Sequence, residues 1–178
     1  LAGYYSVLVN VNDVVAKGAR PIGFVNIISS SSSEVRRKLA EGIWDGLRKY
    51  RLKLLKGHMH PDTSYDCVDA AAVGIAKNFL PSNAAKVGDS LIIAVDIIGK
   101  FRAKGWLKTF DTTTMKSSQE VLDRLNSMIE LAERGLAHAA RDISGPGITG
   151  TLAMLCESSQ IGAMVDLGSI PKPADVEL

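Results

Sequence analysis

The order of hydrophobic and polar residues along the chain predicts its helices, strands and turns. Residues 1–9 are mostly apolar and rich in tyrosine and valine, which favours a strand. A short helix follows, for which Asn12 or Asp13 can serve as N-cap and Gly18 marks the end. The next apolar run, residues 22–28, predicts a second strand.

Apolar residues then recur at helical spacing, which predicts an amphipathic helix over about 32–50. The serines before it, followed by Glu34, fit a capping box with Ser31 as N-cap. A strand is predicted at 51–56. Residues 65–76 favour another strand, with a short alanine-rich helix as the alternative.

The second half repeats this alternation of strands and helices after a linker at 78–88, which carries proline, asparagine and glycine. Its predicted elements are a buried strand at 89–96, an irregular stretch at 99–115, a helix opening at Ser117 or Ser118 with Glu120 in its first turn, a helix at 148–158 and a closing strand at 163–167. The linker divides the chain into two expected α/β domains, residues 1–87 and 88–178.

Composition narrows the function classes. The 178 residues carry a net charge of +2, which gives no argument for nucleic-acid binding. No segment is apolar for long enough to span a bilayer, so no membrane partner is expected. The two cysteines, Cys67 and Cys156, have no metal-type spacing and predict reduced thiols in a cytoplasmic protein. Because the chain starts without Met and ends in an acidic tail, we expect a fragment of a longer protein.

Two aspartates stand at turns where charged ligands are often bound. Asp13 follows the first predicted strand and precedes a helix, a place that commonly holds cations or phosphates. Asp142 begins the turn 142–147, whose glycines allow the backbone to approach an anion closely. Each also has a purely structural interpretation: Asp13 can be a helix cap, and the stretch 142–147 that begins with Asp142 can be a simple turn.

A third candidate is the segment 57–63. His58 and His60 are two residues apart and face the same side of an extended chain, with Asp62 two residues further on. They can bind a metal, receive a phosphate or shuttle a proton. A metal site needs more ligands than this segment provides, and a polar surface loop is the alternative.

Four motifs, taken in order, resemble the aminoimidazole ribonucleotide (AIR) synthetase superfamily. Residues 9–21 resemble its VNDxxxxGAxP segment, and Lys56 to Met59 stand at its Gly-Gly-(Glu, Asp or His)-Thr turn. Residues 86–92 resemble the opening of its second domain, and residues 142–148 its Asp-started turn before a helix. The match is nearest to the AIR synthase-related branches that include a methanogenesis-marker group.

The resemblance implies a two-domain fold in which the N-terminal domain forms a β-barrel dimer and a C-terminal α/β domain folds against it, both truncated here. It also implies ATP cleavage with Mg²⁺, because phosphoryl transfer depends on carboxylates that hold the metal. The expected partners are a second copy of the chain and a small-molecule substrate.

The resemblance assigns roles to ten residues. Asp13 and Asp142 would hold the metal, and His58 and Asp142 would be catalytic. Nucleotide contacts are expected from Asn10, Asn12, Asp13, Gly18, Gly57, Ser144, Gly145 and Gly147.

Three features depart from the superfamily pattern. The upstream Gly-Asp-Asp-Ala-type motif, which supplies further carboxylates, is not found in this sequence, nor is the superfamily's sequence that follows the strand at 163–167. Lys56 and Met59 replace the usual Gly and Thr. The fragment alone is therefore expected to bind Mg-ATP poorly, and a non-catalytic dimeric scaffold or regulatory homologue is the alternative.

Overall fold

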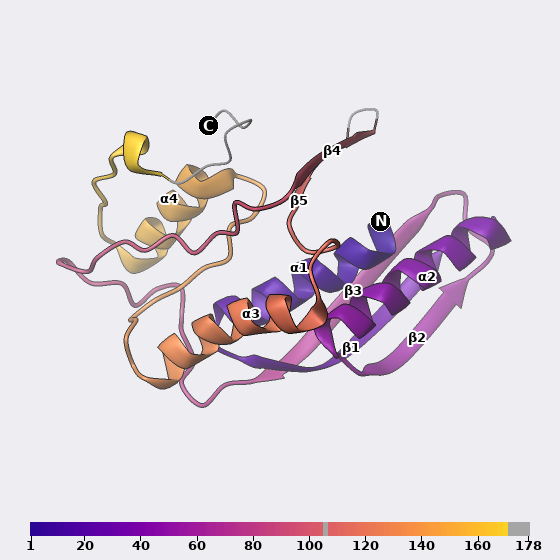
Figure 1. Ribbon diagram of the computed structural model, residues 1–178, viewed down its shortest axis with the longest axis horizontal. Coiled ribbons are helices and arrows are strands. Elements are labelled where there is room, and N and C mark those ends of the chain that lie inside the picture. Colours follow the sequence, from indigo (N-terminus) through magenta and orange to yellow (C-terminus); the bar gives the residue numbers. More distant parts are fainter. Residues whose placement is uncertain (105–106, 171–178) are drawn as a thin grey trace.

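A computed structural model describes residues 1–104 and 107–170, and Figure 1 shows their arrangement. The first half contains α1 (Ala2–Ala16), β1 (Arg20–Ser29), α2 (Ser33–Tyr50), β2 (Leu54–His60) and β3 (Cys67–Ile75). The second half contains β4 (Lys100–Lys104), β5 (Leu107–Asp111), α3 (Ser118–Glu133), α4 (Gly147–Ser159) and the 3-10 turn η1 (Leu167–Ser169). Helices and strands are mixed, as the sequence predicts. The acidic tail at 171–178 lies outside the described residues.

The first element is a helix, so the strand predicted at 1–9 is wrong. Its buried apolar residues are three or four positions apart, at Tyr4, Val7, Val11 and Val15. This spacing places them on one helical face, and packing of that face overrides the strand preference of valine and tyrosine. Asp13 lies in the last turn of α1 and is not an N-cap, whereas Gly18 follows the helix end at φ 72°, as predicted.

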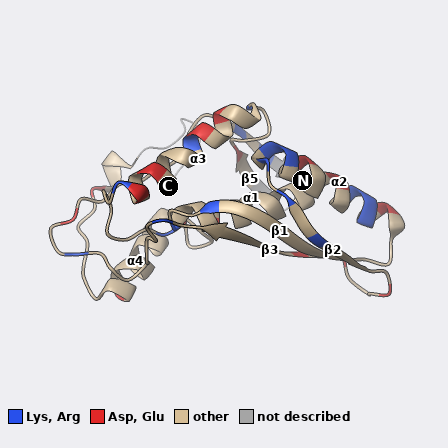
Figure 2. Ribbon diagram, turned by 90° about the horizontal axis from the view of Figure 1, so that it is seen from below, with Lys and Arg blue, Asp and Glu red and all other residues tan. Residues whose placement is uncertain are grey.

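The sheet of the first half has β1 at its centre, with β2 parallel on one side and β3 antiparallel on the other. Along β1, Phe24 and Ile28 are buried under the helices, whereas Val25 and Ile27 are exposed on the opposite face. Figure 2 shows α1, α2 and α3 on one side of this sheet. The described strands form no closed barrel within one chain.

Two of the predicted strands in this sheet are confirmed and one is shifted. β1 includes the predicted run 22–28, and β3 confirms the strand interpretation of 65–76 over the helical one. β2 begins three residues later than the predicted 51–56 and continues through His60. The candidate segment 57–63 therefore belongs mostly to a strand rather than to a loop.

Serine caps define the starts of α2 and α3. Ser32 accepts a hydrogen bond from the Val35 N–H, so the cap is one residue later than predicted. Glu34 is consequently not part of a capping box and pairs with Lys38 instead. α3 does have a capping box, between Ser117 and Glu120, which confirms the predicted helix start.

One hydrophobic core joins both halves of the chain. Val121 and Ile129 of α3 belong to the same buried cluster as Phe24 and Ile28 of the sheet. α3 therefore packs over α1 and α2, and the second half is attached to the first by apolar contacts as well as by the chain itself.

Two strands predicted in the second half are wrong, and a hairpin replaces an irregular stretch. Residues 89–96 and 163–167 have no paired strand in the described chain, and without a partner their backbone groups cannot form a ladder. β4 and β5 form an antiparallel hairpin inside the stretch 99–115, of which residues 105 and 106 are not described.

The base of the hairpin is fixed by the buried Asp111. Its carboxylate accepts hydrogen bonds from the N–H groups of Thr113 and Thr114, at 3.1 and 3.0 Å, and from Arg102 Nε at 2.7 Å. Burial acts to raise the pKa of Asp111, but hydrogen bonds led by that of the Thr114 hydroxyl lower it below its usual value. Thr113 Oγ1 in turn lies 2.8 Å from the Tyr4 hydroxyl oxygen, which ties the hairpin to α1.

Candidate functional site

Asp13 and Asp142 come together from opposite ends of the chain. Asp13 lies in the last turn of α1, and Asp142 lies in the stretch without regular secondary structure that precedes α4. The pKa of Asp13 is raised, first by partial desolvation and then by the negative charge of Asp142. The two carboxyl groups are close enough to form a hydrogen bond when one is protonated. The structure thus brings together the two carboxylates to which the family resemblance assigns the metal.

Lys17 lies beside this pair. It follows Asp13 by one helical turn, so both side chains lie on the same face of α1. Its ammonium group donates to Ser82 Oγ at 2.5 Å and to the carbonyl oxygen of Ala140 at 2.9 Å. Burial lowers the pKa of Lys17, whereas the charge of Asp142 acts to raise it. Lys17 therefore connects the end of α1 to the segment that carries Asp142.

Backbone hydrogen bonds fix the same junction. The Leu80 N–H donates to the Lys17 carbonyl oxygen at 3.0 Å, and the Ala140 N–H donates to the Pro81 carbonyl oxygen at 3.1 Å. Residues 80–82 thus lie between α1 and the stretch that leads to Asp142. This three-part contact explains why two distant carboxylates meet here.

Arg141 adds a further positive charge to the junction. Its charge lowers the pKa of Lys17, which places the two cations near each other. Arg141 Nε is buried and has no hydrogen-bond partner in the described part of the chain. A buried donor without a partner costs free energy, which an oxygen atom of a ligand would recover.

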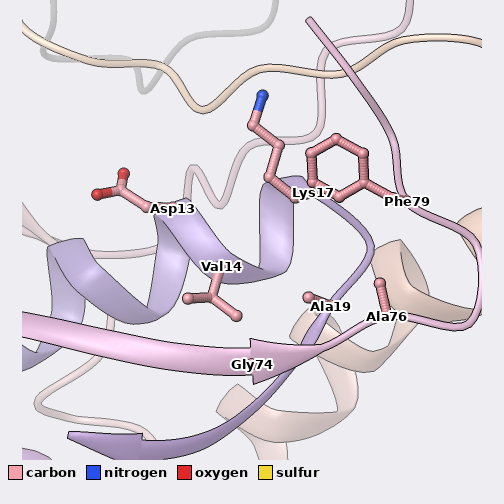
Figure 3. Close-up of a pocket in the computed structure, with 7 residues that line it drawn as sticks. All are labelled: Asp13, Val14, Lys17, Ala19, Gly74, Ala76 and Phe79. Atoms are coloured by element: carbon pink, nitrogen blue, oxygen red, sulfur yellow. The ribbon is translucent and has the colours of Figure 1, made fainter.

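A hollow of about 460 Å³ opens next to the carboxylate pair. Its walls are mostly apolar, with Asp13 and Lys17 as the charged residues (Figure 3). The lining residues are Asp13, Val14, Lys17, Ala19, Gly74, Ala76 and Phe79. The volume lies within the range of roughly 300–1,000 Å³ that is typical of small-molecule sites.

The turn 142–147 leads directly into α4. Gly147, at φ 71°, donates its N–H to the Ser144 carbonyl oxygen at 2.9 Å, and Ser144 donates its own N–H to Thr151 Oγ1 at 3.3 Å. A Cβ added to Gly145 would meet no atom within 4 Å, so this part of the turn is open to a ligand. Helix α4 confirms the helix predicted at 148–158.

His58 is on a different surface. It pairs with Ile27, whose side chain is exposed on the sheet face opposite to α1 and α2, so its side chain points to that face. Its ring lies 4.6 Å from that of His60, centroid to centroid. Within one chain, the structure therefore does not bring His58 to the carboxylate pair. A Cβ added to Gly57 would lie 3.5 Å from Asn26 Oδ1, so Gly57 faces the other side of the sheet.

The remaining predicted residues lie along α1. Asn10 shares a face with Asp13 and donates to the Ser6 carbonyl oxygen at 2.8 Å, whereas Asn12 is exposed on a different side. Among residues 1–104 and 107–170, no group of three or more histidine, cysteine, aspartate or glutamate side chains is arranged to hold a metal. A metal here would thus rely on Asp13, Asp142 and oxygen atoms from its ligand or from water.

Sequence reasoning missed four residues of the site: Lys17, Phe79, Ser82 and Arg141. For Lys17 a signal was available, because it follows Asp13 by four residues, but that spacing has meaning only if the segment is a helix. Nothing in the sequence marks Phe79 and Ser82, because their positions depend on the contact between the linker and α1. Arg141 directly precedes the predicted Asp142, but no motif distinguishes it from other arginines.

Comparison with known proteins identifies the family. The model for the AIR synthase related protein, N-terminal domain, matches residues 1–76, and the model for its C-terminal domain matches residues 87–178. The chain belongs to the AIR synthase related family. This membership confirms the resemblance inferred from the four motifs.

Relatives in this family include kinases and synthases. An uncharacterized protein of Methanocaldococcus jannaschii is 41% identical over 179 residues, covering 99% of the chain and 55% of the relative. The thiamine-monophosphate kinase of Pyrococcus abyssi is 26% identical, with coverages of 96% and 56%. The chain spans about half the length of these curated relatives.

A solved structure shows the same fold. It is T. maritima PurL complexed with ATP, with a TM-score of 0.69 at 20% identity, covering 98% of this chain and 29% of that one. In the described part of our chain, no helix combines the length and the hydrophobicity that crossing a membrane requires.

Proposed function

We propose that the full-length protein is an ATP- and Mg²⁺-dependent enzyme that transfers a phosphoryl group or joins molecules in a ligase-like reaction on a small metabolite. The observation that carries this proposal is the pairing of Asp13 with Asp142, two carboxylates from distant segments. Burial raises the pKa of Asp13, and the like charge of Asp142 raises it further. A divalent cation would remove the repulsion between the two carboxylates. Mg²⁺ prefers oxygen ligands and is commonly held by one or two carboxylates and the phosphates of its substrate.

The neighbouring residues suit a phosphate chain. Lys17 and Arg141 supply positive charge, and Arg141 Nε, which has no hydrogen-bond partner among the described residues, supplies a buried donor. The open turn at Ser144, Gly145 and Gly147 precedes α4, where exposed N–H groups favour an anion. Catalysis of phosphoryl transfer consists mostly of such positioning and charge neutralisation. The names of family relatives, which include a kinase and an ATP-bound protein, support this assignment.

We further propose that the two family segments, 1–87 and 88–178, act as domains that form this site at their junction, in a protein of the cytoplasm. The partly exposed free thiols Cys67 and Cys156 support that compartment. No part of this proposal requires nucleic acid as a partner.

The uncovered sheet face supports a homodimer through the N-terminal segment. Val25, Ile27 and Val73 lie on this face with exposed fractions of 38, 40 and 51%. Burying such a face against a second copy would remove apolar surface from water and bring His58 to the interface. We also propose that the sheets of the two copies together close a β-barrel. In this dimer His58 would have its catalytic role.

Replacing Ile27 with lysine is expected to convert the dimer to a monomer, because an ammonium group would be buried at the interface. Sedimentation velocity of the purified full-length protein measures this directly. Leu136→Lys, at an exposed apolar residue outside the sheet, is the matched control and should remain dimeric. A monomeric wild-type protein would contradict the homodimer.

A second candidate function is that of a non-catalytic scaffold or regulatory homologue. It is favoured by Lys56 and Met59, which replace the Gly and Thr of the family turn, and by the distance of His58 from the carboxylate pair within one chain. Such a protein would keep the fold and lose turnover.

Isothermal titration of the full-length protein with Mg-ATP tests the proposal. We expect saturable heat with Mg-ATP and a marked loss of that heat when EDTA removes the metal. Absence of heat from the wild-type protein would reject the nucleotide site. Binding without any ATP turnover would favour the scaffold.

A further inference from the structure

Phe79 is an apolar residue held in an exposed position. Phe79 is 62% exposed, although its neighbour Leu80 is only 3% exposed. The chain is fixed on both sides of it. Asn78 Nδ2 donates to the carbonyl oxygens of Ala132 and Glu133, at 3.2 and 3.0 Å. The Leu80 N–H donates to the carbonyl oxygen of Lys17 at 3.0 Å. These anchors fix the residues on both sides of Phe79, whose ring is exposed.

The same anchors place the Phe79 ring at the hollow beside the carboxylate pair. Figure 3 shows the ring next to the Lys17 side chain, with Asp13 one helical turn away. The floor is formed by small apolar residues, namely Val14, Ala19, Gly74 and Ala76. The Phe79 ring and the small apolar residues therefore line one part of the hollow, Lys17 lies beside the ring, and Asp13 lies at the other end.

This division fits a ligand that is flat and uncharged at one end and anionic at the other. A nucleotide has that form, because its base has an apolar π face and its phosphates bind metal and cations. Asp13 belongs both to the hollow and to the carboxylate pair, so one ligand can contact both. The small side chains on the floor leave room for a ring.

We propose that Phe79 is the base-stacking residue of this site, with the purine ring of ATP lying against it over the small apolar floor. The inference rests on the proposed function and adds to it a residue that selects the base. Asp13 and Asp142 then act on the phosphate end through the metal, and Phe79 acts only on the base end. The two ends can be tested separately because inorganic tripolyphosphate has the phosphates and lacks the base.

The experiment measures dissociation constants by isothermal titration for Mg-ATP and for Mg-tripolyphosphate, with the full-length protein. Phe79→Ala is expected to weaken Mg-ATP binding by about 10- to 100-fold, which is the effect of losing one stacked base. Binding of Mg-tripolyphosphate is expected to stay the same. Phe79→Tyr, which keeps a ring, should retain the affinity, and Phe79→Leu, which keeps apolar volume without a ring, should lose most of it.

Phe101 provides the matched control, because it is 56% exposed and lies on the β4–β5 hairpin away from the hollow. Phe101→Ala should bind both ligands like the wild type. Circular dichroism of each variant verifies the fold, and the Tyr and Leu variants carry the test if Phe79→Ala does not fold.

Each other outcome has a defined meaning. Unchanged Mg-ATP affinity in Phe79→Ala and Phe79→Leu would overturn the base-stacking role and leave the proposed function standing. An equal loss for Mg-ATP and Mg-tripolyphosphate would show a general structural role and also overturn it. If the wild type binds Mg-tripolyphosphate as tightly as Mg-ATP, the base adds nothing to the affinity. That result would also overturn the base-stacking role of Phe79. If the wild type binds neither, the proposed function fails and the inference fails with it.

Discussion

Replacing Asp13 with asparagine is expected to lower ATP turnover of the full-length protein by about two orders of magnitude or more. Asparagine keeps the size of the side chain and one carbonyl oxygen, but it loses the negative charge that would hold Mg²⁺ with Asp142. Steady-state ATPase measurements at saturating Mg²⁺ give the comparison. Asp142→Asn should have the same effect, and the double variant should cost little more, because the pair acts as a unit.

The Asp13→Asn substitution is expected not to destabilise the fold. This result would separate a functional role of Asp13 from a structural one. The pKa of Asp13 is raised in the folded protein, so its charged form is disfavoured there. Its carboxylate lowers the folding stability as the pH rises from the ordinary pKa through the raised one, and the full cost is present at neutral pH. Removing the charge at neutral pH should therefore keep or slightly raise the melting temperature. Asp45→Asn on the exposed surface of α2 is the control for turnover. Wild-type turnover in Asp13→Asn, or a strongly lowered melting temperature, would contradict the metal role.

Replacing Gly3 with alanine is expected to destabilise the protein by about 3 kcal/mol. A Cβ at this position would lie 2.1 Å from the Leu39 carbonyl oxygen and 2.9 Å from the Ile43 backbone nitrogen of α2. Both are backbone atoms of a helix, so they cannot move aside as the end of a flexible side chain does. In a free helix the same change would stabilise by about 1 kcal/mol, so the sign of the effect reports the close approach of α1 and α2.

Thermal unfolding measures this change, with an expected fall in melting temperature of roughly 6–12 °C. Gly162→Ala is the matched control, because an added Cβ there meets nothing within 4 Å. It should unfold like the wild type. A Gly3→Ala protein as stable as the wild type would mean that the two helices are further apart than the structure places them.

Elements with strong local signals were predicted correctly from the sequence. α3 opens with a capping box at Ser117, and α2 opens with a serine cap one residue later than predicted. Both starts depend on hydrogen bonds within a few residues of each other. β1 and β3 were found because turn residues bound their apolar runs, and the ordered motifs identified the family.

Elements whose conformation depends on packing were mispredicted. The segment 1–9 has strand-like composition, but it lies against α2 and the sheet, where burying one helical face outweighs the preference of valine for strands. Residues 89–96 are apolar enough for a strand and find no strand to pair with in the described chain. Composition alone cannot reveal whether such a partner exists.

The candidate site likewise has features that the sequence reveals and features that depend on packing. By itself, the sequence determined the family, the capped start of α3, the start of α2 to within one residue, and Asp13 and Asp142 as candidate carboxylates, because these depend on local chemistry and on motif order. Only the tertiary structure decided that α1 is a helix and that these carboxylates lie together beside Lys17. It also decided that His58 faces the opposite side of the sheet and that Phe79 lines the adjacent hollow. The physical reason is that each of these facts depends on contacts between segments far apart in the chain, whose free energy exists only once the fold has formed.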